Sequence, residues 1–145
     1  MRDLSEADEP TVLRNCDLHG LNLSQLEMPN WRFEKCNLVG TSFNGAMLEG
    51  AVFDGCRAAG ASFVSAVLTE AEIASGDSSN TSFRGATLAA MKIAHCKMTG
   101  ADFSEARASG MELEDILFVF ALLPKMPFHK MTLKQIDFTE ADLRS

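Results

Sequence analysis

From Leu13 to Leu143, every fifth residue is an apolar side chain, with one exception, in a single unbroken frame. We call these 27 positions central; only Ala58, Ser78 and Ala108 among them are smaller than Leu or Ile. A second set, two residues before each central position, is mostly Ala or Cys. A period of five fits neither an α-helix, at 3.6 residues per turn, nor a strand, at two. It fits a chain that turns a corner once in every five residues.

Side chains of one type recur at every twentieth residue, which indicates how many corners close one coil. Four central phenylalanines have this spacing: Phe43, Phe63, Phe83 and Phe103. The cysteines fall on a second grid of the same spacing, with Gly76 in the one empty slot: Cys16, Cys36, Cys56 and Cys96. If each pentad forms one side of a square, residues 20 apart stack on successive coils. The sequence therefore predicts a four-sided solenoid of nearly seven coils with these side chains inside.

Several pentads approach the pattern A(D/N)LXX, most clearly residues 36–40 (CNLVG), 101–105 (ADFSE) and 141–145 (ADLRS). The chain resembles the pentapeptide-repeat family over residues 11–145. The resemblance implies an all-β fold, a right-handed quadrilateral parallel β-helix of about seven coils. We expect residues 1–10 to form an N-terminal extension and residues 11–145 a single domain.

Glycine marks the expected corners, because nine of the ten glycines lie two residues after a central position. Glycine adopts positive φ without steric cost, and Asn and Asp, which share this position in other pentads, also tolerate it. The four cysteines, placed inside the column, are interpreted as small buried hydrophobic side chains rather than as disulfides or metal ligands.

No motif in the chain predicts catalysis. The three histidines lie in different coils at outward positions, no Ser/His/Asp arrangement can be placed, and neither glycine-rich phosphate motif occurs. No window of 18 residues is apolar throughout, and the acidic start of the chain is unlike a secretory signal. We therefore expect a cytoplasmic protein that is not an enzyme, needs no cofactor or metal, and keeps its cysteines reduced.

Two pentads depart from the pattern near the first and the middle coils. Residues 76–80 (GDSSN) keep the frame but lose their large core side chains, which indicates a bulged, solvated side or, alternatively, a loop that contacts a partner. Trp31 occupies a position that is otherwise small, as do Leu21 and Leu26. We interpret these large residues as a plug for the N-terminal end of the column. The alternative is a Trp exposed in a binding patch.

The third departure, residues 116–127, is the candidate interaction site. Its inward positions stay apolar, but four outward positions that are polar or small elsewhere also carry apolar side chains: Leu117, Val119, Phe120 and Leu122. Contiguous exposed apolar residues mark interaction sites. Pro124 and Pro127 lack an N–H and are predicted to interrupt the hydrogen-bond ladder. Alternatively, residues 112–123 form a short helix packed over the coil.

The end of the sequence adds to this interpretation. The last pentad, residues 141–145, is followed by no capping segment in the sequence, and an uncapped coil exposes strand edges. Together with the apolar residues around Phe120, this predicts an isologous homodimer through the C-terminal coils. Alternatively, the apolar residues bind a different protein, or the chain is a fragment of a longer repeat protein.

Charge provides the remaining clue. The net charge is −7, with 17 acidic against 9 basic residues over residues 1–115 and 3 against 4 over residues 116–145. The densest acidic group is a candidate partner surface: Asp102, Glu105, Glu112, Glu114 and Asp115. Such a surface disfavours direct binding of nucleic acid and favours basic partners.

Two functions are compatible with this sequence. The resemblance implies an acidic, dimeric mimic of DNA that binds DNA gyrase or a related topoisomerase, as the family's quinolone-resistance and immunity proteins do. The alternative is a rigid interaction or regulatory scaffold with no link to nucleic-acid enzymes. In both, the chain acts through protein–protein contacts and does not enter a membrane.

Overall fold

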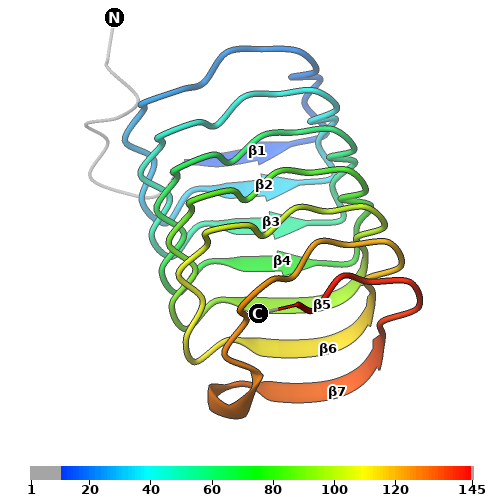
Figure 1. Cartoon of the computed structure of the whole chain (residues 1–145). Helices are drawn as coiled ribbons and strands as arrows, with labels where there is room; N and C mark the ends of the chain where they lie inside the picture. Colours follow the sequence, from blue (N-terminus) through cyan, green and yellow to red (C-terminus); the bar gives the residue numbers. More distant parts are fainter. Residues whose placement is uncertain (1–10, 145) are drawn as a thin grey trace, which may run out of the picture.

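The structure, a computed structural model, describes residues 11–144 as a right-handed parallel β-helix with four sides (Figure 1). Seven strands on one side form a parallel sheet in sequence order. They are β1 (Val12–Arg14), β2 (Arg32–Glu34), β3 (Val52–Asp54), β4 (Glu72–Ala74), β5 (Lys92–Lys97), β6 (Glu112–Leu117) and β7 (Thr132–Asp137). Each strand pairs with the next at a register of 20 residues, as Phe33 does with Phe53. The predicted quadrilateral coil is confirmed, with a coil count close to the predicted one. The predicted extension, residues 1–10, lies outside the described residues.

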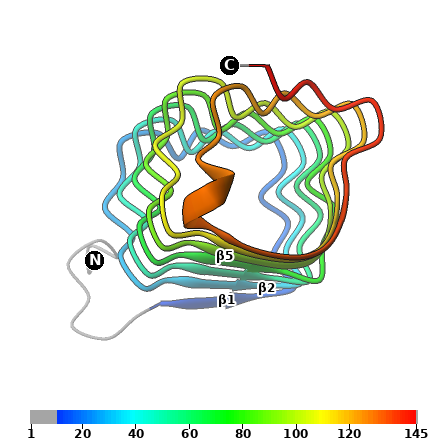
Figure 2. The ribbon, with the colours of Figure 1, turned by 60° about the horizontal axis from the view of Figure 1, so that its bottom comes forward.

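A complete coil has four sides of five residues, as the register of 20 residues requires. Figure 2 shows the coils stacked around the column. In the first coil, sides 1, 2, 3 and 4 are residues 11–15, 16–20, 21–25 and 26–30, and later coils repeat this division. Sides 2, 3 and 4 are joined from coil to coil by single bridges, again between residues 20 apart, such as Asn22 with Ser42 on side 3. Residues ten apart in the sequence therefore lie on opposite sides of the column.

The corners lie two residues after the central positions. From Asn15 to Glu140, every such position except Lys130 has positive φ, between 53° and 64° for the other residue types and between 66° and 74° for the nine glycines. This left-handed conformation is unfavourable for any residue that has a Cβ atom. The glycines therefore concentrate at the corners. The prediction that glycine marks the corners is confirmed.

The Asp or Asn of the repeat accepts a hydrogen bond from a backbone N–H that makes no bond to a neighbouring coil. The residue after a central position points its N–H along its own coil, and the side chain two residues earlier accepts it, as Asp102 Oδ1 does from Ser104 at 2.8 Å. Pro124 occupies this position. It therefore removes no bond between coils, and the prediction that it interrupts the ladder is wrong.

Pro127 interrupts the hydrogen-bond ladder, as predicted, because it directly precedes a central residue. One coil earlier, the N–H of Arg107 donates to Ala86 O at 2.9 Å, a bond that proline cannot make. The bridges of side 4 run from Glu27 only as far as Arg107. The chain leaves the regular coil at this point and forms the 3-10 turn η2 (Phe128–Lys130).

The core is a column of stacked side chains. The rings of Phe43, Phe63, Phe83 and Phe103 are parallel, with successive centroids 4.9, 5.1 and 4.8 Å apart. The four cysteines are free thiols; Cys36, Cys56 and Cys96 are buried and Cys16 is half-buried. Burial raises the pKa of Cys56 to about 11. The phenylalanine ladder and the burial of the inner cysteines are as predicted.

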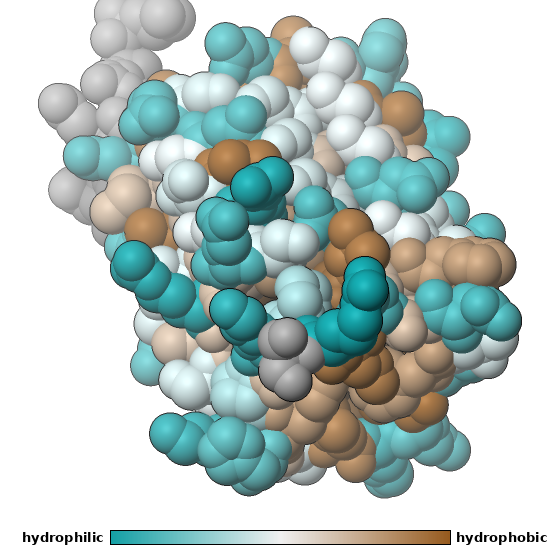
Figure 3. Space-filling view, viewed as in Figure 1, coloured by the Kyte–Doolittle hydropathy of each residue, from teal (hydrophilic) through white to brown (hydrophobic). Residues whose placement is uncertain are grey.

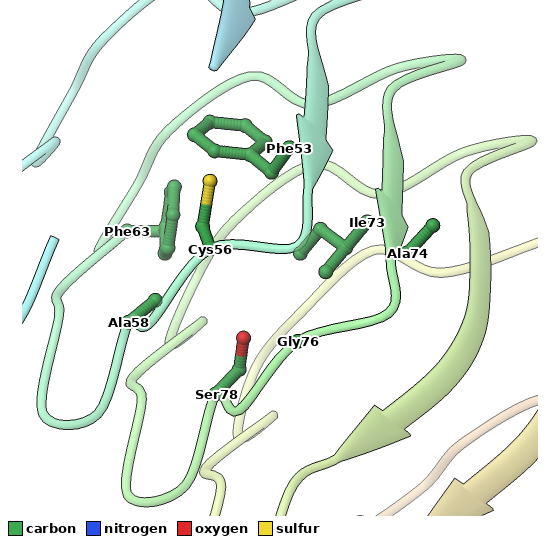
Figure 4. Close-up of a pocket in the computed structure, with 8 residues that line it drawn as sticks. All are labelled: Phe53, Cys56, Ala58, Phe63, Ile73, Ala74, Gly76 and Ser78. Carbon is green, nitrogen blue, oxygen red and sulfur yellow. The ribbon is translucent and has the colours of Figure 1, made fainter. Parts of the chain in front are cut away.

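The pentad at residues 76–80 closes onto the column instead of bulging. Ser78 is buried, and Asp77 keeps its bridges to both neighbouring coils. Glycine permits this, because a Cβ on Gly76 would lie 2.4 Å from the carbonyl oxygen of Cys56. The close approach leaves only a small cavity between coils (Figure 4), lined by Phe53, Cys56, Ala58, Phe63, Ile73, Ala74, Gly76 and Ser78. The expectation of a bulged, solvated side is wrong.

Trp31 belongs to the core of the second coil. It is buried, and its ring lies 6.2 Å from that of Phe33. The alternative of an exposed Trp in a binding patch is therefore wrong. Leu21 and Leu26, which share its position in the first coil, are exposed and do not join it in a plug.

Candidate interaction surface

The four outward apolar residues form one band around a corner of the sixth coil. Leu117 ends β6 on side 2, Val119 lies on the same side, Phe120 is the corner, and Leu122 begins side 3. Leu117, Phe120 and Leu122 are 43%, 61% and 41% exposed, and Val119 is half-buried. Because β6 and the corner at Phe120 belong to the regular coil, the alternative of a helix over residues 112–123 is wrong. We call Leu117, Val119, Phe120 and Leu122 the apolar band.

The repeat frame itself turns these side chains outward. Phe118, Ala121 and Leu123 alternate with the band and are fully buried. The backbone is held by both neighbouring coils: the N–H of Phe118 donates to Asp137 O and that of Leu122 to Ala101 O, each at 2.8 Å. The band is therefore a fixed feature of the rod, with no freedom to fold its apolar side chains inward.

Phe120 is held in an unfavourable conformation. Its φ is 59°, and among the described residues with positive φ it is the one Phe, Tyr or Trp. In the five preceding coils the same corner is glycine or asparagine, and in the seventh coil it is a charged residue: Gly20, Gly40, Gly60, Asn80, Gly100 and Glu140. A bulky residue with left-handed φ costs about 1–2 kcal/mol. Fifteen other described corner residues with a Cβ share this positive φ, so the conformation belongs to the coil, and the bulky apolar ring is what distinguishes Phe120.

Acidic side chains border the band. The bridge partners of Leu122 are Asp102 in the preceding coil and Asp142 in the following one, and Leu117 pairs with Asp137. Glu140 is the corner residue that follows Phe120 by one coil. We call Asp102, Asp137, Glu140 and Asp142 the acidic rim.

Hydrogen bonds favour the ionised form of two rim carboxyls. The hydroxyl and the N–H of Thr139 donate to Asp137 and lower the pKa of that carboxyl. Arg144 donates to both oxygens of Asp142, at 2.9 and 2.7 Å, and lowers its pKa. Among the residues that the structure describes, Asp102, Asp137 and Glu140 form no ion pair.

The acidic group predicted from the sequence is not one surface. Glu112, Glu114 and Asp115 belong to side 1, whereas Asp102 and Glu105 lie on side 3, across the column. Four of the five pair with a cation or His on an adjacent coil: Glu112 with Lys92 (3.6 Å), Glu114 with Lys134 (3.6 Å), Asp115 with His95 (2.9 Å) and Glu105 with Arg84 (3.4 Å). Ten residues of separation place side chains on opposite sides, so closeness in sequence misled the prediction.

The net charge is also distributed unevenly. Residues 1–10 hold one basic and four acidic residues, which is −3 of the total of −7, and they lie outside the described part. The described coils therefore carry 16 acidic and 12 basic residues, a net charge of −4. Acidic and basic side chains often alternate from coil to coil, as in the bridged series Arg57, Asp77 and Lys97 on side 2.

A second apolar area lies on the last coil, and sequence reasoning did not identify it. Leu133 and Leu143 are 39% and 46% exposed, and Phe128 and Phe138 are only partly buried although all four are central residues. In Figure 2, η2 lies across the opening of this coil, and Phe128 packs against the core. Apolar side chains gather over the last two coils in Figure 3. We call Phe128, Leu133, Phe138 and Leu143 the end face.

Other kinds of site are not evident in the part of the chain that the structure describes. Within residues 11–144, no group of three or more His, Cys, Asp or Glu side chains is arranged to hold a metal ion. Within the same residues, no helix is long and apolar enough to cross a membrane.

Comparison with known proteins agrees with the fold. A family model described as pentapeptide repeats matches eight copies over residues 30–63 and 79–118. Full-length QnrB1, a plasmid-mediated fluoroquinolone resistance protein, superimposes with a TM-score of 0.59 at 24% identity, covering 90% of this chain and 69% of QnrB1. A trypsin-treated QnrB1 variant gives a TM-score of 0.57 at 16% identity, covering 94% and 85%. No curated protein matches the sequence. At these identities the solved structures establish the fold alone.

Proposed function

The chain belongs to the pentapeptide-repeat family, and we propose that it works without catalysis, as a rigid rod that binds other proteins through its last two coils. The distribution of exposed apolar side chains carries this proposal. Among the residues that the structure describes, ten large hydrophobic side chains are exposed. Five belong to the first two coils, and the other five lie between residues 117 and 143: Leu117, Phe120, Leu122, Leu133 and Leu143. None of the ten belongs to the third, fourth or fifth coil. Leu117, Phe120 and Leu122 lie within six consecutive residues and form one band with Val119, and contiguous exposed apolar residues mark interaction sites.

The first partner in this proposal is a second copy of the chain, bound through the end face. A two-fold contact would cover Leu133 and Leu143 and the open edge of β7 on both copies. Light scattering after size-exclusion chromatography tests this contact. We expect a dimer for the natural chain and a folded monomer for Leu143→Glu. The control is Val39→Glu, which places the same charge at an exposed apolar position of the second coil. A monomeric natural chain would contradict the dimer, and a Leu143→Glu variant that remains dimeric would contradict a contact through the end face.

A second candidate function is a mimic of DNA that protects or inhibits DNA gyrase. The net charge of −7 and the likeness in fold to QnrB1 favour it. The distribution of charge favours the more general scaffold, because the described coils carry only −4 and many of their carboxylates are ion-paired.

A supercoiling assay with purified gyrase discriminates the two functions. A DNA mimic changes the rate of supercoiling, and its effect weakens steeply as salt rises, because the contact is electrostatic. A scaffold unrelated to nucleic-acid enzymes leaves the rate unchanged at every salt concentration.

A further inference from the structure

We propose that the apolar band is a docking site, separate from the end face, for a segment of another protein in which Leu or Phe side chains alternate with Lys or Arg. This inference rests on the proposed function and adds the chemistry of the partner. The end face lies at the end of the column, whereas the band lies on the outside of the sixth coil, at the corner of sides 2 and 3. The two surfaces are therefore distinct, although the seventh coil contributes to both through Asp137 and Asp142 of the rim and Leu143 of the end face.

Phe120 is the anchor of the site. It combines 61% exposure with a φ of 59°, so neither burial nor backbone preference explains an aromatic residue at this corner. Asn80 and Gly100, at the same corner of the two preceding coils, show which residues the coil itself prefers. Aromatic side chains are the commonest anchors of protein interfaces, since they contribute a large contact area with little rotamer entropy to lose.

The acidic rim sets the charge of the partner. Asp137 and Glu140 lie beside the band on the following coil, and Asp102 lies beside it on the preceding coil. The preceding coil also pairs one cation with the band, Lys97 with Leu117. Arg144 is already bound to Asp142. A segment whose apolar side chains contact Leu117, Phe120 and Leu122 therefore brings its flanking residues against negative charge, which favours Lys and Arg.

The same rim disfavours a second copy of the chain at this site. An isologous contact centred on Phe120 would place each rim against the equivalent rim of the other molecule. Like charges at such an interface oppose association, whereas a basic segment is attracted. The band is thus suited to a different partner.

Fluorescence anisotropy with defined peptides tests the proposal. The probe is a fluorescein-labelled dodecapeptide of alternating Lys and Leu, and the controls are the alternating Glu and Leu peptide and the alternating Lys and Ser peptide. We expect the Lys/Leu probe to bind about tenfold more tightly than either control peptide, because charge and apolar contact are both required. We expect Phe120→Gly to weaken binding of the probe by about tenfold or more. The matched control Ala90→Gly makes the same substitution at a corner with φ of 58° on another side, and should bind within about twofold of the natural chain.

The location of binding is tested by amide chemical shifts of the isotope-labelled protein on addition of the probe. The proposal requires the largest changes at residues 117–122 and 137–142. Changes centred on another side, equal binding of the Lys/Ser peptide, or unchanged binding to Phe120→Gly would overturn it. Conversion of a dimer to a monomer by Phe120→Gly would also overturn it, because the band would then contact a second copy. Leu143→Glu separates the two proposals. If this variant is monomeric and binds the probe as the natural chain does, both proposals are supported. If the natural chain is already monomeric and binds the probe, only the dimer is contradicted.

Discussion

Replacing Phe120 with glycine tests whether this residue serves the fold or a partner. Three contributions to the free energy of unfolding change. Removing the left-handed strain stabilises the fold by about 1–2 kcal/mol. The greater freedom of glycine in the unfolded chain costs about 0.5–1 kcal/mol. The third contribution is the contact that the ring makes with the rod.

That contact is small because Phe120 is 61% exposed. A phenylalanine that buries about 40% of a side-chain area of roughly 200 Å² removes about 80 Å² from water. At about 25 cal/mol per Å², this is worth at most about 2 kcal/mol, since the unfolded chain already buries part of the ring. The three contributions nearly cancel. We expect Phe120→Gly to change the free energy of unfolding by less than about 2 kcal/mol in either direction.

Urea denaturation followed by circular dichroism measures this change. The slope of the unfolding free energy with urea should be unaltered, since the column stays intact. A loss of more than about 3 kcal/mol would refute the reasoning, because it would mean that Phe120 contributes like a core residue. The Ala90→Gly variant shows how much the change of backbone freedom contributes by itself.

Three further predictions concern the column. Phe83→Ala should lower the free energy of unfolding by about 3–5 kcal/mol in the same assay, because the ring is fully buried and stacks on Phe63 and Phe103 at 5.1 and 4.8 Å. Gly76→Ala should lower it by about 1–3 kcal/mol, since the new Cβ would lie 2.4 Å from the backbone oxygen of Cys56; a neutral result would contradict the close approach. Burial raises the pKa of Cys56 from 9.0 to about 11, so its contribution to stability is complete below pH 9 and is lost as the pH rises through about 11. Denaturation midpoints measured from pH 8 to 11 should therefore fall, and Cys56→Ala should fall less steeply.

The period of five predicts most of this fold. The frame placed the phenylalanine ladder, the corners and the inward cysteines where they lie, because each coil repeats the same local geometry. The predictions from the frame were wrong where a residue acts through its backbone. Nothing in the size of Ser78 shows that Gly76 lets the chain move inward to meet it, and nothing in proline's general properties separates Pro124 from Pro127. The two prolines differ because only some N–H groups point along the column toward a neighbouring coil, and only the hydrogen-bond pattern shows which ones do.

The candidate sites divide in the same way. The apolar band could be identified from the sequence, because the frame assigns each of its residues to an outward position. The acidic surface could not be read from closeness in sequence, because Asp102 and Glu112 belong to opposite sides. The end face was missed because Leu133 and Leu143 obey the frame, and their exposure depends on how the seventh coil is covered rather than on the residues themselves.

A repeat column of this kind separates stability from recognition more cleanly than a globular core does. The central positions and the small residues before them hold the coils together, so an outward side chain is nearly free of that task. An outward residue that opposes the preference of its own coil is therefore informative. Lys125 and Glu140 are polar corner residues with positive φ, as expected at exposed positions. Phe120 has the same backbone but exposes an apolar ring to water, and contact with a partner accounts for that exposure.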